Sequence, residues 1–223
     1  MIYCIGDSFT FGAELPGAVE ITKTSSEFAW PNLLAQQLNH PVTNLGMGGC
    51  GNTRIVKRIF DCVLAVDKSP LIIAWTSPFR IELTDKEGLF DAWPGRNTER
   101  MCNVRSPIVK ELDKLYNRNT DYWAYKNWLR QIILVQSFLK QYNHPYIMLQ
   151  SHVTQDLNRQ FKDRDQLLKS QIDLTKFIGW PYEGMTEWTY GCPKGPMGHP
   201  MELGHQKIAE KINEHIRHLG WVS

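Results

Sequence analysis

Three short runs, at residues 2–5, 71–75 and 146–150, are apolar except for Gln150, and small or polar residues follow each of them. A continuous apolar run of this length is typical of a parallel strand that is buried on both faces of a sheet. Segments between the runs, such as 121–142, carry apolar residues at helical spacing, which predicts helices that connect parallel strands. The sequence therefore predicts an α/β domain with three α/β/α layers, of the flavodoxin-like kind.

The predicted parallel sheet has about five strands. Residues 42–45 form the second strand along the chain, and a short fifth strand is expected near Phe177 and Ile178. Right-handed crossovers give the spatial order 2-1-3-4-5. A chain of 223 residues, 42% of them hydrophobic, can bury one sizeable core, so we expect 1–223 to form a single domain. The polar, charge-rich segment 81–119 is interpreted as an insertion.

The opening stretch, MIYCIGDSFTFG, places Ser8 in a turn directly after the first apolar run. A buried strand followed by glycine and small polar residues presents a side chain and backbone N–H groups at the carboxyl edge of a sheet. An ordinary turn would explain Gly6-Asp7-Ser8 as well. The opening stretch alone therefore leaves the role of Ser8 open.

The other end of the chain supplies a histidine, His199, just before an amphipathic helix. The apolar stripe of this helix comprises Leu203, Ile208, Ala209, Ile212 and Ile216. Such a helix must pack on the sheet, which could bring His199 over Ser8. His152, which follows the run at 146–150, is a second candidate for the same position.

A glycine-rich segment at 46–51 precedes a predicted helix that begins at Asn52 or Thr53. Free N–H groups at such a turn can bind an anion. The spacing does not match a dinucleotide-binding loop, and no lysine of the phosphate-loop type follows. We therefore do not assign a nucleotide or any other cofactor.

Three blocks in this order resemble the SGNH (GDSL) hydrolase family. They are Gly-Asp-Ser near the N-terminus, Asn-x-Gly-x-x-Gly at 44–49, and His-Pro before the last helix. The resemblance implies that Ser8 is the nucleophile and His199 its base. It also implies an oxyanion hole that includes the N–H groups of Ser8 and Gly49.

Two parts of the family pattern are missing. The third strand should lead into a Gly-x-Asn-Asp block, but here Thr76-Ser77-Pro78-Phe79-Arg80 follows it. Ser77 is assigned to the oxyanion hole as the nearest substitute. Asp7, Thr76 and Arg80 are assigned to substrate binding, although a surface arginine would also fit position 80.

The second missing part is the aspartate that in the family stands three residues before the histidine, where this chain has Pro196. Proline carries neither a carboxylate nor an N–H group. His199 must then be oriented by a main-chain carbonyl, by Glu183 or Glu187, or not at all. We expect a carbonyl within 194–198, because this Pro/Gly-rich approach constrains the backbone.

Two functions from different classes remain open. The first is a serine hydrolase, an esterase or carbohydrate O-deacetylase, that cleaves a small acyl ester with a Ser8–His199 dyad. The second is a protein of the same fold that has lost catalysis and keeps the cleft as a binding or structural surface. The retained serine and histidine favour the hydrolase.

Composition limits the partners of the chain. A net charge of +2 gives no argument for nucleic-acid binding. The five cysteines contain no C-x-x-C pair, so neither a metal site nor a disulfide framework is indicated. No apolar run suggests a signal peptide or a membrane span. We expect a cytoplasmic protein with no cofactor or metal, acting on a small-molecule or glycan ester; the oligomeric state is not predicted.

Overall fold

The central sheet has four parallel strands in the described part of the chain, in the order β2-β1-β3-β6. Their bounds are β1 (Ile2–Ile5), β2 (Val42–Asn44), β3 (Leu71–Trp75) and β6 (Tyr146–Gln150). The computed structural model describes residues 1–19, 24–65, 68–85, 88–92, 120–151 and 155–221. Within this part, the predicted α/β class and the order of the first four strands are confirmed.

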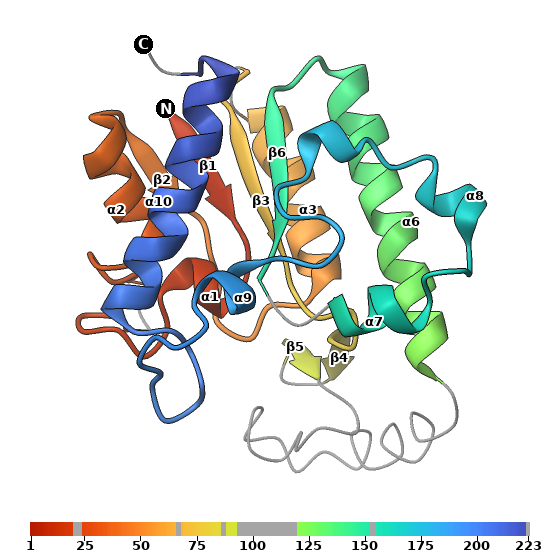
Figure 1. The fold of residues 1–223 in the computed structure, drawn as a ribbon, viewed down its shortest axis with the longest axis horizontal. Coiled ribbons are helices and arrows are strands. Elements are labelled where there is room, and N and C mark those ends of the chain that lie inside the picture. The colour runs from red at the N-terminus through yellow and green to blue at the C-terminus, as the bar shows by residue number, and fades with distance from the viewer. Residues whose placement is uncertain (20–23, 66–67, 86–87, 93–119, 152–154, 222–223) are drawn as a thin grey trace.

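Helices cover both faces of the sheet (Figure 1). One face carries α2 (Trp30–Leu38) and α10 (Glu202–Leu219), and the other carries α3 (Asn52–Ala65) and α6 (Thr120–Gln141). The other helical elements of the described residues are short: α1 (Ser8–Phe11), α7 (Gln155–Gln160), α8 (Gln166–Lys169), the 3-10 helix η1 (Leu174–Lys176) and α9 (Met185–Trp188).

The apolar core consists of two layers, one on each side of the sheet. Successive side chains of a strand point to opposite faces, so Ile73 packs with α3 and α6 whereas Ile72 packs with α2 and α10. All five side chains of β3 are buried, as its continuous apolar run predicts. The predicted α/β/α layering is therefore confirmed.

The expected fifth strand is reduced to a single bridge. Phe177 forms one isolated parallel bridge with Met148, and the Ile178 N–H donates to the Met148 carbonyl at 2.8 Å. A 3-10 helix ends at Lys176 just before this pair, and Gly179, with φ +76°, turns the chain immediately after it. Two extended residues are too few for a strand, so within the described residues the sheet has four strands instead of about five.

The segment interpreted as an insertion, 81–119, begins with an antiparallel hairpin that was not expected. Its strands are β4 (Ile81–Asp85) and β5 (Gly88–Ala92), with Ile81 paired to Ala92. Residues 93–119 lie outside the described residues. The single-domain assignment of 1–223 stays a prediction.

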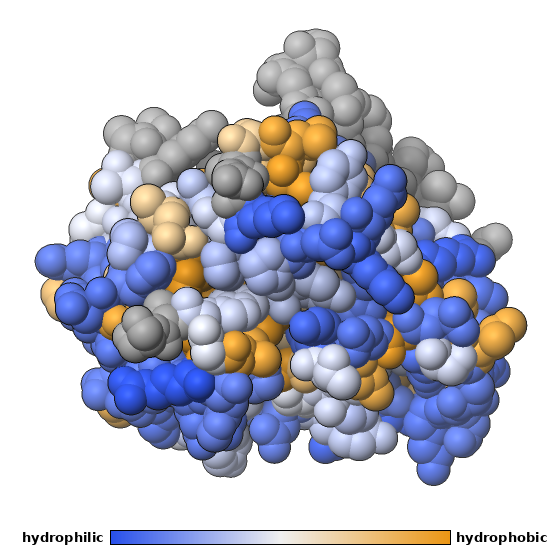
Figure 2. Space-filling view, turned by 90° about the horizontal axis from the view of Figure 1, so that it is seen from above, coloured by the Kyte–Doolittle hydropathy of each residue, from blue (hydrophilic) through white to orange (hydrophobic). Residues whose placement is uncertain are grey.

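The surface in Figure 2 is mostly hydrophilic, and apolar residues occur on it in separate groups. This pattern is usual for a protein whose apolar side chains are gathered in an internal core. Within the described residues, every helix is too short or too polar to cross a bilayer.

Helix α2 begins at a contact with α10. The Trp30 N–H, the first of α2, donates to Nδ1 of His205 at 3.1 Å, and no side chain at the N-cap position supplies this acceptor. His205 is fully buried. Burial, and secondarily the neighbouring His199, lower the pKa of His205 to about 3. The neutral ring of His205 is therefore the form that accepts the first N–H group of α2.

The unfolding free energy is expected to fall as the pH is lowered. Between the ordinary histidine pKa of 6.5 and the folded value of about 3, the unfolded chain binds a proton that the folded chain excludes. Stability is lost by about 1.4 kcal/mol per pH unit in this window. Denaturant unfolding of His205→Gln, whose amide oxygen can still accept from Trp30, should show a shallower acid-side slope. The exposed His218→Gln is the matched control; equal slopes for all three proteins would contradict the assignment.

Candidate functional site

Helix α1 follows β1 at the carboxyl edge of the sheet (Figure 1), and Ser8, directly after the joining turn, is its first residue. Asp7 is the N-cap of α1, and its Oδ1 accepts the Phe9 N–H at 3.0 Å. Gly6 is required at this turn, because a Cβ there would lie 2.2 Å from Oγ1 of Thr10 and 2.9 Å from the Ala74 side chain. The predicted strand followed by a turn is therefore present.

Ser8 offers a hydroxyl and an N–H group to a further partner. The side chain is almost fully buried, yet its Oγ has no hydrogen-bond partner among the described residues. Its N–H, the first of α1, likewise has no acceptor there. A buried hydroxyl is usually bonded, so this one is notable.

Asp7 joins the carboxyl ends of three strands. Its Oδ2 accepts from Oγ1 of Thr76 at 2.5 Å and from Oγ of Ser151 at 3.0 Å. Thr76 directly follows β3 and Ser151 directly follows β6. The carboxylate is fully buried, and buried carboxylates are stable only when they are well bonded. This network therefore fixes the backbone that carries Ser8.

Arg80 adds a positive charge to the network. Its Nη1 lies 3.6 Å from Oδ2 of Asp7 and donates to the Cys50 carbonyl at 3.2 Å. The side chain is only 3% exposed, so the surface alternative for this arginine is wrong. Arg80 ties the glycine-rich loop to the turn that carries Ser8.

The turn after β3, where the family block is missing, is held by Asn52. Its Nδ2 donates to the Thr76 carbonyl at 3.1 Å, and its Oδ1 accepts the Thr76 N–H at 3.0 Å. Ser77 is buried beside this pair, and its carbonyl accepts the Arg80 N–H. The structure therefore groups Asp7, Thr76, Ser77 and Arg80; their oxyanion and substrate roles stay predictions.

The glycine-rich loop runs along the β1–α1 turn. The Met47 N–H donates to the Gly6 carbonyl at 3.0 Å, and Asn44 bridges the loop to α1 by donating to the Thr10 carbonyl at 2.8 Å. Gly49 is exposed, with φ +68°, and its N–H has no acceptor among the described residues. Gly49 remains a predicted oxyanion donor.

His199 is presented by a tight hairpin before α10. The Gly195 N–H donates to the His199 carbonyl at 2.9 Å, and the Met201 N–H donates to the Pro193 carbonyl at 3.0 Å. The Nδ1 atom of the ring lies 2.6 Å from Oε2 of Glu14. The predicted acceptor for His199 exists, but the prediction of a main-chain carbonyl, with Glu183 or Glu187 as alternatives, is wrong.

The Glu14 carboxylate is fixed by the same hairpin. Its Oε1 accepts the Met197 N–H at 2.8 Å, and its Oε2 accepts the His199 N–H at 3.2 Å. A Cβ at position 195 would lie 2.8 Å from the Glu14 carboxyl carbon, so a larger residue there would displace this carboxylate. Glu14 itself adopts φ +67°, and strain of this kind often marks functional sites.

The charge of Glu14 is stabilised by these contacts. Burial alone would raise the pKa of its carboxyl, but the bonds from Met197 and His199 outweigh burial, so the pKa lies below its ordinary value. The carboxylate therefore stays ionised in mildly acidic solution. The stability that the ionised Glu14 carboxylate contributes is fully present at a pH above its ordinary pKa. This stability is lost as the pH falls through the lowered pKa of the folded protein.

His199 packs against the segment that begins with Ser8. The ring centroids of Phe9 and His199 are 5.6 Å apart, and Glu14 follows α1 two residues after the capping Gly12. The structure thus places His199 against Phe9, the residue after Ser8, and the Ser8–His199 dyad stays a prediction. The alternative base, His152, lies outside the described residues.

Sequence reasoning missed Glu14 and Asn52 as parts of this site. The Pro16-Gly17 pair predicts a loop over 13–26, and a carboxylate in a loop carries no local signal of a distant partner. The sequence predicts a helix that begins at Asn52 or Thr53, and α3 begins at Asn52. Glu14 could have been found by searching for a carboxylate in the segment after Ser8. Asn52 could have been found by searching for an amide side chain near the end of β3.

No group of three or more metal-ligating His, Cys, Asp or Glu side chains occurs within the described ranges. Cys4, Cys50, Cys62 and Cys192 are buried free thiols, and Cys102 lies outside the described residues.

The fold is that of the SGNH (GDSL) hydrolases. The chain is similar to a member of the lipolytic G-D-S-L family from Veillonella parvula, with 16% identity, a TM-score of 0.51 and 96% of each chain covered. An acetyl xylan esterase from Butyrivibrio proteoclasticus gives a TM-score of 0.58 at 16% identity, over 99% of this chain and 64% of that one. A family two carbohydrate esterase from Clostridium thermocellum gives 0.51 at 18% identity, over 99% and 65%.

Neither a protein-family model nor a curated protein matches the sequence. At these identities the likeness establishes the fold, and a function must be argued from the site.

Proposed function

We propose that the chain is a serine hydrolase of the SGNH type that cleaves a small acyl ester, with Ser8 as nucleophile, His199 as general base and Glu14 as the residue that orients the base. The observation that carries this proposal is the 2.6 Å contact between Nδ1 of His199 and Oε2 of Glu14. This contact supplies a carboxylate that can orient the histidine, in place of the family aspartate that is missing at position 196.

The contact determines which ring nitrogen faces the reaction. Glu14 holds Nδ1 as an N–H donor, so Nε2 is left unprotonated to accept a proton. A serine hydroxyl is a weak nucleophile until such a base removes its proton. The unbonded Oγ of Ser8 is the group that needs this base, and His199 lies against its segment.

The reaction proceeds in two halves. The Ser8 Oγ attacks the ester carbonyl carbon while its proton passes to Nε2 of His199, and the intermediate expels the alcohol, which takes that proton. Water then attacks the acyl-serine with His199 again as the base, releasing the carboxylic acid and restoring Ser8. Glu14 stabilises the imidazolium formed in each half and stays ionised.

The N–H groups of Ser8 and Gly49 are proposed as oxyanion donors, each worth roughly 3 to 4 kcal/mol of transition-state stabilisation if correctly aimed. Both lack acceptors within the described residues. Arg80 supports the arrangement by linking Asp7, next to Ser8, to Cys50, next to Gly49. The missing family asparagine is thus offset by a rigid backbone frame.

The substrate class is proposed from the neighbours of the fold, which include an acetyl xylan esterase and a carbohydrate esterase in complex with cellohexaose. The proposed substrate carries a short acyl group, such as an O-acetyl group on a carbohydrate, or is another short-chain ester. The alcohol portion of the ester is a small molecule or a glycan.

A fluorophosphonate probe is expected to modify the protein once, at Ser8, because only a serine activated by a base attacks such a probe readily. Intact-mass measurement should show one adduct, and peptide mapping should place it on Ser8. The Ser8→Ala variant should stay unmodified, whereas Ser170→Ala, at an exposed serine, should be labelled like the wild type.

The same experiments can also refute the hydrolase. A wild-type protein that is neither labelled at Ser8 nor able to hydrolyse acetyl or butyryl nitrophenyl esters would refute the hydrolase. The cleft would then serve binding alone, the second function considered from the sequence.

A further inference from the structure

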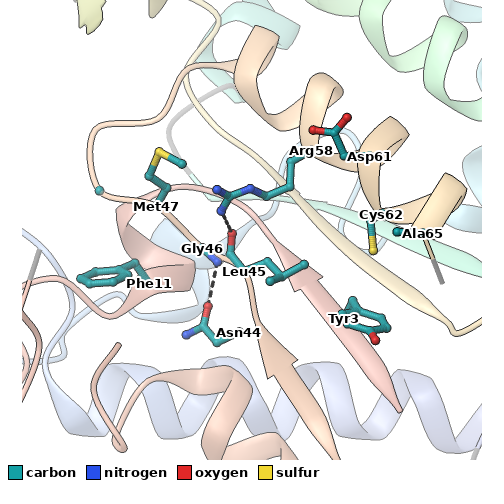
Figure 3. Close-up of a pocket in the computed structure, with 11 residues that line it drawn as sticks. Tyr3, Phe11, Asn44, Leu45, Gly46, Met47, Arg58, Asp61, Cys62 and Ala65 are labelled. Atoms are coloured by element: carbon teal, nitrogen blue, oxygen red, sulfur yellow. Dashed lines mark hydrogen bonds between the residues drawn. The ribbon is translucent and has the colours of Figure 1, made fainter. Parts of the chain in front are cut away.

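A cavity of about 600 Å³ lies between α3 and the β1–β2 edge of the sheet (Figure 3). This volume is in the range of small-molecule sites. The apolar part of its lining includes Tyr3, Phe11, Leu45 and Met47, and α3 contributes Arg58 and Asp61. The cavity is therefore a largely apolar space with two charged side chains on one wall.

The cavity is separate from the proposed catalytic site. Neither Ser8 nor His199 lines it. Gly46 closes the space between the cavity and α1, because a Cβ at this position would lie 2.3 Å from the Phe11 backbone nitrogen. The glycine-rich loop therefore lines the cavity as far as Gly48, and the lining includes neither Ser8 nor His199.

Arg58 supplies the polar recognition. Its Nη1 donates to the Leu45 carbonyl, which holds the guanidinium across the cavity from α3 to the end of β2 (Figure 3). Within the described part of the chain, no carboxylate pairs with Arg58, and Asp61, one helical turn later, is exposed. The remaining N–H groups of the guanidinium can bind an anion in a forked geometry.

We propose that this cavity binds a medium-chain monocarboxylic acid, with its carboxylate on Arg58 and its hydrocarbon chain along Tyr3, Leu45 and Met47. One guanidinium matches a single negative charge. A phosphate dianion would leave a charge unmatched beside Asp61, and an uncharged molecule would make no use of Arg58. The apolar lining favours a hydrocarbon chain over a sugar.

Calorimetric titration with hexanoate, octanoate, decanoate and 1-octanol tests the proposal. We expect saturable one-to-one binding whose affinity rises about fourfold with each methylene added, until the cavity is full. Octanoate should bind at least tenfold more tightly than 1-octanol. Titrations are made with Ser8→Ala, so the result is independent of the proposed hydrolysis.

Variants on α3 separate this site from any other. Arg58→Gln should weaken octanoate at least tenfold and leave 1-octanol unchanged, whereas Asp61→Asn should strengthen octanoate. Arg130→Gln, at an exposed position on α6, is the charge-matched control and should change nothing. Because Arg58 also bonds the main chain, Ala65→Trp provides a second test, since Ala65 lines the cavity and the larger ring should exclude both ligands.

The proposal is overturned if none of the carboxylates saturates. It also fails if 1-octanol binds as tightly as octanoate, or if octanoate is unaffected by both Arg58→Gln and Ala65→Trp. The last outcome would place the acid elsewhere, for example near Ser8. Circular dichroism of each variant identifies any that fails to fold, in which case the remaining variant decides.

Discussion

Replacing Glu14 by glutamine is expected to lower kcat for an acetyl nitrophenyl ester by on the order of 10⁴-fold, the effect of the equivalent change in a well-studied triad. The glutamine side chain would be neutral, so it could not stabilise the imidazolium, and its NH₂ group could favour the wrong tautomer of His199. The main-chain bonds from Met197 and His199 to position 14 keep the hairpin close. The loss should appear in kcat, with KM changed little.

Glu183→Gln and Glu187→Gln are the matched controls, since both remove a glutamate charge from the approach to His199. Each should stay within a few fold of the wild type. If Glu14→Gln retains a tenth or more of wild-type kcat, Glu14 does not control the base. If instead one of the two controls loses activity, that glutamate takes over the assignment.

Replacing Asp7 by asparagine is expected to destabilise the protein by about 3 to 5 kcal/mol, the usual effect of removing one partner of a buried ion pair. Arg80 would keep its charge beside a neutral side chain. Phe9, Thr76 and Ser151 would then share one acceptor oxygen, because the amide nitrogen cannot accept. The carboxyl ends of β1, β3 and β6 would lose their common acceptor.

Urea unfolding followed by circular dichroism measures this change. The exposed Asp163→Asn is the control and should change the unfolding free energy by no more than about 0.5 kcal/mol. A value for Asp7→Asn near that of the control would show that the carboxylate is not needed to hold the three strand ends. A folded variant would also allow the effect of Asp7 on Ser8 labelling to be measured.

The strands were predictable because their signal is local. Runs such as 71–75 must be buried on both faces, and the structure buries every residue of β3. Phe177 and Ile178 failed as a strand because two apolar residues between a 3-10 helix and a left-handed glycine cannot extend a ladder. The local apolar pattern therefore predicted only those strands that are long enough to contain a continuous apolar run.

The site was predictable only in part, for the same reason. Ser8 and His199 stand in recognisable local motifs, and the structure brings their segments together. Glu14 stands in no motif, and its contact with His199 spans 185 residues. Asn52 replaces a missing block with side-chain bonds from a different element. Contacts of this kind, made between distant segments of the chain, cannot be predicted from the spacing of residues within a motif.

The order of these residues along the chain has a consequence for when the protein can act. Ser8 and Glu14 leave the ribosome together, but His199 is added 185 residues after Glu14. At about 5 to 20 residues per second, this delay is roughly ten to forty seconds. Under the proposed assignment, a nascent chain carries its nucleophile and its acid without a base throughout that time. Hydrolysis therefore begins only when the last hairpin has been made and has docked on Glu14.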